Sequence, residues 1–172
     1  MTITSIEQLN LASPEQAYDW FLQTCSSEKW CYNMLNKRPF DNLDDIKKCA
    51  NDMWQTMQTT DLMEAFSGHP MIGDMSTLRA KYANTSALAS HEQSGVQTAS
   101  EAVLAELHAK NKAYLEKHGF IFIIFASGLS AKSMLKALLA RLPNNTATEL
   151  QNAAQEQIKI TVNRIEKALK AD

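Results

Sequence analysis

Apolar side chains recur every three or four positions through most of this chain, which is the spacing of one face of an α-helix. The clearest stripe covers about five helical turns near the end of the chain. It consists of Leu150, Ala154, Ile158, Thr161, Ile165 and Leu169. Shorter stripes occur at residues 18–22, 46–57, 103–114 and 134–142. This pattern predicts a helical protein.

Capping signals indicate where several of these helices begin. Ser13-Pro14-Glu15-Gln16 provides an N-cap serine, a proline at the first helical position and a glutamine placed to close a capping box. Residues 38–40 (Arg-Pro-Phe) break the chain before the stripe at 46–57. Ser130 can cap the helix over 134–142. Thr146-Ala147-Thr148-Glu149 has the form of a capping box for the last helix.

Residues 120–126 (Phe-Ile-Phe-Ile-Ile-Phe-Ala) are apolar at every position, which suits a buried strand and an inner helix equally. Because the sequence offers no partner strand, a sheet is hard to build. We expect a buried core segment, extended at its start, that leaves the core at Ser127-Gly128. The predicted fold class is all-α: a single-domain helical bundle over residues 1–172 with this one buried apolar segment.

The composition is that of an ordinary globular protein. Of its 172 residues, 45% are hydrophobic and 21% are charged, and the chain is long enough for one domain with its own core. A net charge of -2 gives no basic footprint, so nucleic acid is not an expected partner. The longest apolar run is too short to span a membrane, and the first residues lack the features of a signal peptide. We therefore expect no membrane partner and a cytoplasmic location.

Most of the cysteine, tryptophan and histidine side chains have a structural interpretation. The odd number of cysteines and the lack of a Cys-x-x-Cys pair argue against disulfides and structural zinc. Buried reduced thiols are therefore expected at Cys25, Cys31 and Cys49. The tryptophans expected in the core are Trp20, Trp30 and Trp54. The histidines expected at the surface, because their neighbours are polar, are His91, His108 and His118.

The run His69-Pro70-Met71-Ile72-Gly73-Asp74 is the strongest candidate for a reaction site. Proline disfavours the α region for the residue before it, so His69 should lie at or beyond the end of a helix that carries residues 62–66. Gly68 and Gly73 relax the steric limits on either side. An imidazole on such a turn can titrate near neutral pH. The alternative is that the His-Pro pair simply ends a helix.

Other reaction motifs are absent from the sequence. It contains no glycine-rich phosphate loop, no Gly-x-Ser-x-Gly elbow and no His-Glu-x-x-His pair. Neither His69 with Asp74 nor His91 with Glu92 has the spacing of a standard metal-ligand set. We therefore expect no metal site.

Ten short elements nevertheless form an ordered set that covers nearly the whole chain. They are Lys29-Trp30, Arg38-Pro39-Phe40, His69-Pro70-x-Ile72-Gly73-Asp74, Glu92-Gln93-x-Gly95, Asn111-x-x-Tyr114, Gly119-Phe120-x-Phe122, Arg141-Leu142, Glu149-Leu150, Glu156-x-x-Lys159-Ile160 and Arg164. In this order they resemble the 2-oxo-4-hydroxy-4-carboxy-5-ureidoimidazoline (OHCU) decarboxylase family. The resemblance implies a helical enzyme, commonly a homodimer, that converts the small molecule OHCU to (S)-allantoin and carbon dioxide. This is the last step from urate to allantoin, and it uses neither a metal nor an organic cofactor.

The resemblance also implies roles for particular residues. It places the catalytic imidazole on His69 and a second catalytic group on Glu92. The implied substrate-binding residues are Pro70, Ser90, Gln93, Ile123, Ile124, Phe125, Ala126, Ser127 and Arg164, with residues 123–127 acting through their backbone. A serine often stands three residues before the family glutamate. This chain has Ala89 there, and Ser90 one place later is the candidate for that role.

These residue types suit a decarboxylation. Loss of carbon dioxide leaves an electron pair that the adjacent imine group of OHCU can accept, so no cofactor is needed as an electron sink. His69 can move protons, Glu92 can accept N–H donors, and Arg164 offers a planar fork to a carboxylate or carbonyl. Two alternatives remain: a cyclic ureide hydrolase that uses His69 and Glu92 on water, and a helical binding module without catalysis.

Overall fold

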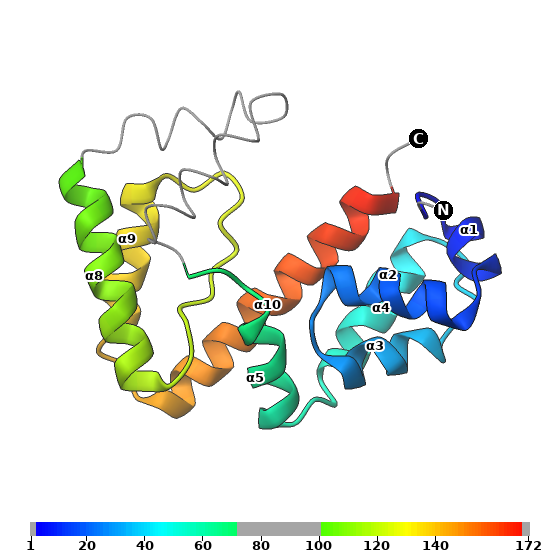
Figure 1. The fold of residues 1–172 in the computed structure, drawn as a ribbon, viewed down its shortest axis with the longest axis horizontal. Helices are drawn as coiled ribbons and strands as arrows, with labels where there is room; N and C mark the ends of the chain where they lie inside the picture. The colour runs from blue at the N-terminus through cyan, green and yellow to red at the C-terminus, as the bar shows by residue number, and fades with distance from the viewer. Residues whose placement is uncertain (1–2, 72–100, 170–172) are drawn as a thin grey trace. The chain divides into compact units, whose positions relative to one another are not determined.

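A computed structural model describes residues 3–71 and 101–169. Within these ranges the chain forms eight α-helices and no strand (Figure 1). The helices are α1 (Ile6–Leu11), α2 (Pro14–Thr24), α3 (Glu28–Leu35), α4 (Leu43–Trp54), α5 (Thr59–Ser67), α8 (Glu101–His118), α9 (Ala131–Arg141) and α10 (Thr146–Leu169). The predicted all-α class is confirmed for the described part of the chain. None of the helices in it is both long enough and apolar enough to cross a membrane.

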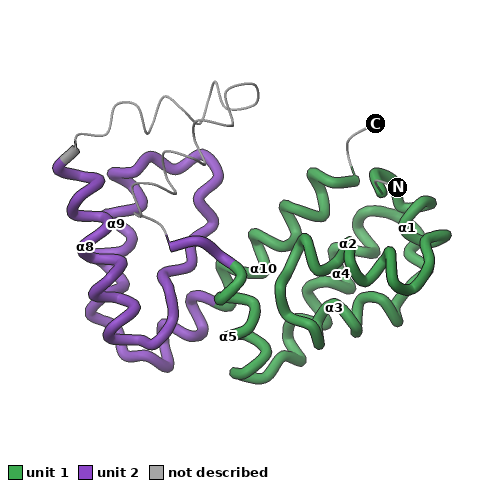
Figure 2. The backbone as a smooth tube through the Cα atoms, in the orientation of Figure 1, with its two compact units in different colours: residues 1–68, 154–172 green, residues 69–153 purple. Residues whose placement is uncertain are grey.

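The chain separates into two compact units (Figure 2). Unit 1 comprises residues 1–68 and 154–172, and unit 2 comprises residues 69–153. Helix α10 therefore begins in unit 2 and continues in unit 1.

Local capping explains where the helices of unit 1 start. The Oγ of Ser13 accepts from the backbone N of Gln16 at 3.2 Å, and the Gln16 side chain accepts from the backbone N of Ser13 at 3.1 Å, so the predicted capping box is confirmed. The apolar pattern does not predict α1 or α3, because 6 and 8 residues are too few to establish a helical period. The apolar pattern also includes Met57 in the stripe at 46–57, but α4 ends at Trp54, so Met57 lies beyond the helix.

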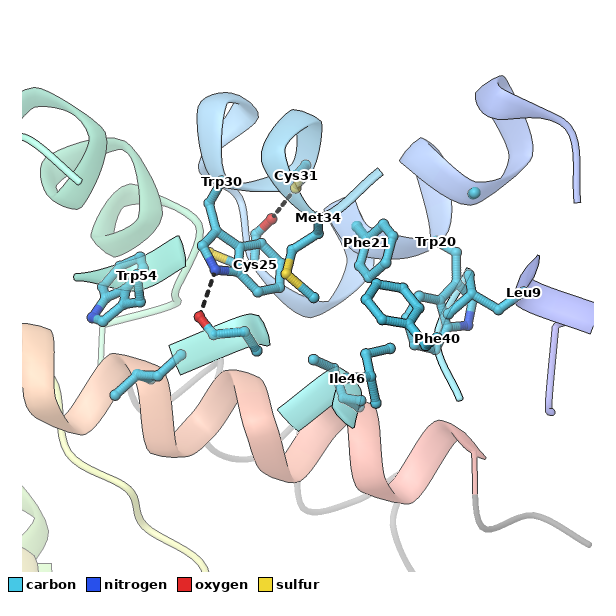
Figure 3. Close-up of a cluster of buried hydrophobic side chains, with 14 of the residues drawn as sticks. Leu9, Trp20, Phe21, Cys25, Trp30, Cys31, Met34, Phe40, Ile46 and Trp54 are labelled. Atoms are coloured by element: carbon cyan, nitrogen blue, oxygen red, sulfur yellow. Dashed lines mark hydrogen bonds between the residues drawn. The ribbon is translucent and has the colours of Figure 1, made fainter. Parts of the chain in front are cut away.

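The core of unit 1 is built around aromatic rings (Figure 3). The Phe21 ring meets those of Trp20, Trp30 and Phe40 edge to face, with centroids 5.2, 6.0 and 6.2 Å apart. Each buried indole also donates its N–H to a backbone carbonyl, as Trp30 does to Ala50 at 3.1 Å. The tryptophans are core residues, as predicted.

The cysteines are free thiols, as expected. Cys25 and Cys31 are buried, whereas Cys49 is half-buried. Burial raises the pKa of the Cys25 thiol to about 11 and also raises the pKa of Cys31. Because the thiolate is the reactive form of cysteine, both side chains are unreactive members of the core.

Arg38 ties the first helix of unit 1 to the chain after α3. Its Nη1 donates to the carbonyls of Leu9 and Ala12 at 2.7 and 2.9 Å. Two residues later, the Phe40 backbone exchanges two hydrogen bonds with the Asn10 side chain, at 2.8 and 2.9 Å. Arg38 therefore has a structural role.

In unit 2 the chain changes direction at two glycines with positive φ. Gly119 (φ 79°) ends α8, and Gly128 (φ 75°) precedes α9, both in the region that favours glycine. Ser130 caps α9, as predicted, by accepting from the backbone N of Ser133 at 3.1 Å. Between the glycines, residues 121–126 form neither helix nor strand.

The segment 120–126 is only partly the buried segment that its composition predicts. Phe120, Phe122 and Ile123 are buried. The half-buried members are Ile121, Ile124, Phe125 and Ala126. The second half of the segment therefore leaves the core earlier than predicted.

The start of α10 corrects the second predicted capping box. The N-cap is Asn145, whose Oδ1 accepts from the backbone N of Thr148 at 2.8 Å. Glu149 does not reach back to the N-cap, because its carboxylate is fully buried and binds side chains from elsewhere in unit 2. The hydroxyl of Thr146 instead lies 3.1 Å from Nδ1 of His118.

His118 is not the surface residue that its polar neighbours predict. Its side chain is only 6% exposed, and its ring packs on that of Tyr114 with centroids 4.4 Å apart. Burial lowers the pKa of its imidazole below the ordinary value of 6.5. Folding therefore favours the neutral form of the His118 imidazole.

This burial predicts a loss of stability in mild acid. As the pH falls below about 6.5, the unfolded chain protonates His118 before the folded chain does, so the free energy of unfolding should decrease. Urea unfolding of the wild type and of His118→Gln at about pH 7.5 and about pH 5.5 measures this difference. We expect a smaller decrease in His118→Gln. An equal decrease in both proteins would contradict the assignment.

Candidate functional site

Helix α5 delivers the candidate catalytic histidine. The helix begins at Thr59, where the Asp61 carboxylate accepts from the backbone N of Gln58 at 2.8 Å and from Lys29 Nζ at 2.9 Å. It ends at Ser67, so His69 lies just beyond the helix, as the following proline predicts. His69 is half-buried, which lets an imidazole meet both the protein and a ligand.

The residue before His69 is held by a close contact in unit 1. A Cβ atom built on Gly68 would lie 1.9 Å from Oγ and 2.6 Å from Cβ of Ser26. Rotation of the serine hydroxyl would not relieve the second clash. Gly68 has φ −74°, so it is needed here for close approach and not for the conformational freedom that the sequence suggests.

Gly68→Ala should therefore displace the end of α5. Overpacking of this kind typically costs about 1–3 kcal/mol, and we expect a lower free energy of unfolding together with weaker turnover. Chemical denaturation and steady-state kinetics measure the two effects. Ser67→Ala is the matched control, because Ser67 is exposed and its hydroxyl donates to the Glu64 carbonyl within α5. Wild-type stability and turnover in Gly68→Ala would show that the contact is unimportant.

Arg164 extends from the unit 1 part of α10. Its Nη1 donates to the carbonyl of Thr24 at 3.1 Å, and burial lowers the pKa of its guanidinium. A guanidinium carries five N–H donors in a fixed fork, so this bond orients the group and leaves capacity for a ligand. Arg164 is not the solvated helix charge that its sequence context alone would suggest.

The link between α2 and α3 is the part of the candidate site that the sequence does not predict. Thr24, at the end of α2, accepts from Arg164, and Ser26 touches Gly68. Ser27 is fully buried and caps α3. Within unit 1, one short link thus contacts both Arg164 and the residue that precedes His69. Its small polar residues give no motif, and only their contacts reveal this role.

The candidate backbone-binding segment, residues 123–127, lies in unit 2. Ile123 is buried and its carbonyl accepts from Arg141 Nη1 at 2.8 Å. The side chains become more exposed toward Ser127, which is an exposed residue. Because residues 123–126 belong to no helix or sheet, their N–H and C=O groups are not committed to a regular ladder. Such backbone can present hydrogen-bonding groups to a ligand.

The other predicted site residues lie partly within the described ranges. Pro70 is described and exposed. The remainder of the motif from Ile72 onward lies outside the described residues, as do Ser90, Glu92 and Gln93. Their roles remain predictions from the sequence.

Known proteins are similar to this chain in sequence and in fold. The chain is 38% identical over 146 residues to the uric acid degradation bifunctional protein TTL of Arabidopsis thaliana, a match that covers 83% of this chain and 44% of that protein. It thus spans less than half the length of this plant relative. It is 23% identical over 167 residues to a 2-oxo-4-hydroxy-4-carboxy-5-ureidoimidazoline decarboxylase of Halalkalicoccus jeotgali, covering 96% of this chain and 92% of that protein.

A solved structure agrees with these relatives. An OHCU decarboxylase crystallised in the presence of (S)-allantoin superposes with a TM-score of 0.73 at 34% identity, covering 88% of this chain and 97% of that one. The family model described as OHCU decarboxylase matches residues 10–166. The chain therefore belongs to the OHCU decarboxylase family.

Proposed function

We propose that this protein decarboxylates OHCU to (S)-allantoin and carbon dioxide. The observation that carries the proposal is His69, which occupies the family motif and stands just beyond α5, where Gly68 packs against Ser26. The solved relative with (S)-allantoin supports the same product. Because the family match runs from residue 10 to residue 166, it covers all of unit 2 and most of unit 1, and we propose that the two units act together as one domain.

The substrate itself supplies the electron sink. When carbon dioxide leaves the hydroxyl-bearing ring carbon, the electron pair of the broken bond forms a double bond to the adjacent imine carbon, and the imine π pair moves to the ring nitrogen, which takes up a proton from water. The hydroxyl group must lose its proton as the ring carbonyl forms, and the ureido-bearing carbon must gain one. The protein therefore has to orient the carboxylate and move two protons.

We assign the proton transfers to His69, whose imidazole can both accept and donate near neutral pH. Glu92 would accept hydrogen bonds from ureido or ring N–H groups, or hold the imidazolium, with Gln93 and Ser90 beside it in sequence. Arg164 would bind a carboxylate or carbonyl through its fork, which Thr24 orients. The backbone of residues 123–127 would complete the grip on the ring.

The setting of the enzyme is also a proposal. We infer a homodimer in the cytoplasm that binds a small-molecule substrate and neither nucleic acid nor membrane. The family resemblance supports the dimer, and the composition supports the location. Analytical ultracentrifugation of the purified protein measures the oligomeric state directly.

Release of carbon dioxide tests the proposed reaction. OHCU labelled at its carboxylate can be generated fresh with uricase and the hydrolase that follows it, and then divided between samples with and without this protein. We expect faster release of labelled carbon dioxide when the protein is present. A ring-opened acid that retains the label would indicate the hydrolase alternative, and an unchanged rate would indicate a binding module.

A further inference from the structure

A buried carboxylate in unit 2 has no place in the proposed proton transfers. Glu149 is fully buried, and its carboxylate accepts hydrogen bonds from Tyr114 Oη, Arg141 Nε, Asn144 Nδ2 and Asn152 Nδ2. The last three donors lie at 2.8 Å. Burial tends to raise the pKa of this group, but the hydrogen bonds and the charge of Arg141 outweigh it, so the pKa is lowered. Glu149 is therefore charged at neutral pH and fixed by four donors.

This carboxylate holds Arg141 in one orientation. The Nε of Arg141 donates to Glu149, while Nη1 of the same guanidinium donates to the carbonyl of Ile123 at 2.8 Å. The guanidinium carbon lies 4.6 Å from the centre of the Phe122 ring. Three contacts in different directions leave a planar guanidinium little freedom.

Ile123 is the first residue of the segment proposed to bind the substrate through its backbone. Since residues 121–126 form neither helix nor strand, no regular ladder sets their geometry, and side-chain ties must do so. We infer that Arg141, held by Glu149, is a positioning residue that fixes the Ile123 carbonyl and thereby aligns residues 123–127 for the substrate. This inference rests on the proposed function, because it requires that segment to contact OHCU.

A neighbouring cation provides a matched comparison. Lys117 also donates to a backbone carbonyl in unit 2, that of Leu142 at 2.8 Å, but its partner lies outside the 123–127 segment. Lys117→Met therefore removes a cation-to-carbonyl bond from the same unit without removing the tie to Ile123. Arg141→Lys keeps the positive charge, but a single ammonium on a flexible stem cannot reproduce the fork to Glu149 and Ile123.

Steady-state kinetics with OHCU and amide hydrogen exchange of the full chain test the inference. For Arg141→Lys we expect KM to rise about tenfold or more, with a smaller change in kcat and a lower enantiomeric purity of the allantoin. Peptides covering residues 120–130 should exchange faster, while those of unit 1 should not. Lys117→Met should match the wild type in KM, in product purity and in the exchange of residues 120–130.

Two results would overturn the inference. One is a folded Arg141→Lys protein whose KM, product purity and exchange all match the wild type. The other is an equal rise in KM in Lys117→Met, which would indicate general loosening of unit 2. If Arg141→Lys does not fold, Glu149→Gln removes the charge that holds Arg141 and keeps the guanidinium itself; a raised KM supports the inference and an unchanged KM contradicts it. Wild-type protein that does not turn over OHCU would defeat the proposed function, whereas the exchange measurement would still report the tie to Ile123.

Discussion

Replacing His69 with alanine is expected to lower kcat for OHCU decarboxylation by ~10²–10⁴, the usual contribution of general acid–base catalysis, and to leave the fold intact. The imidazole is the group assigned to both proton transfers, so both steps lose their catalyst. The side chain is half-buried beyond the end of α5, and its truncation opens no large cavity in the core. Initial rates of allantoin formation and far-UV circular dichroism measure the two effects.

The matched control for this variant is His108→Ala. His108 is an exposed residue of α8, and its loss should change neither turnover nor stability. His69→Asn adds a second arm, because an amide retains hydrogen bonding but cannot take up a proton near neutral pH. Near-normal turnover by folded His69→Ala would end the assignment of His69 as the proton-transfer group.

Trp30→Ala should cause the largest loss of stability, about 3–5 kcal/mol in the free energy of unfolding. The side chain is 0% exposed, and its ring packs edge to face on Phe21 in the core shown in Figure 3. The truncation also leaves the Ala50 carbonyl without the indole N–H that binds it at 3.1 Å. A cavity and an unsatisfied acceptor therefore add together.

Urea denaturation measures this loss, and Tyr32→Ala is its control. Tyr32 is an aromatic residue of the same helix, α3, but it is 60% exposed, so its truncation should cost far less. Similar losses in the two variants would show that Trp30 is not a principal support of the unit 1 core.

Features that depend on neighbouring residues could be predicted from the sequence. The capping box at Ser13, the cap at Ser130 and the end of α5 before His69 all follow from residues within one helical turn. The repeated apolar spacing likewise gives the fold class.

Features that depend on distant residues could not be predicted in this way. Glu149 and Thr146 look like members of a capping box because the local spacing fits, but their partners Tyr114 and His118 lie 35 and 28 residues earlier. A local pattern cannot show that a carboxylate has donors on other helices, as Glu149 has in Tyr114 and Arg141. For the same reason, polar neighbours in sequence misplace His118 at the surface.

The residues of the candidate site show the same difference between local and distant determinants. His69 could be identified from its motif, because the chemistry of an imidazole on a constrained turn is local. For Arg164 only the family resemblance predicts a role in the site, and its bond to Thr24 joins residues 140 positions apart. The sequence pattern also does not predict the hydrogen bond between Arg141 and the Ile123 carbonyl, because neither residue type identifies its partner.

Circular dichroism of the allantoin formed at early times tests the proposed catalysis most directly. In free solution the planar intermediate is protonated on both faces and gives racemic product, whereas one donor at His69 should give a single enantiomer, the S form. Selecting one face needs a difference of only about 2–3 kcal/mol, which one or two charge-assisted hydrogen bonds supply. We predict a rapid (S)-allantoin signal with the wild type and none with His69→Ala. Racemic allantoin formed at a rate that depends on the enzyme would contradict stereospecific proton delivery by His69, and a rate that does not depend on the protein would contradict the proposed function itself.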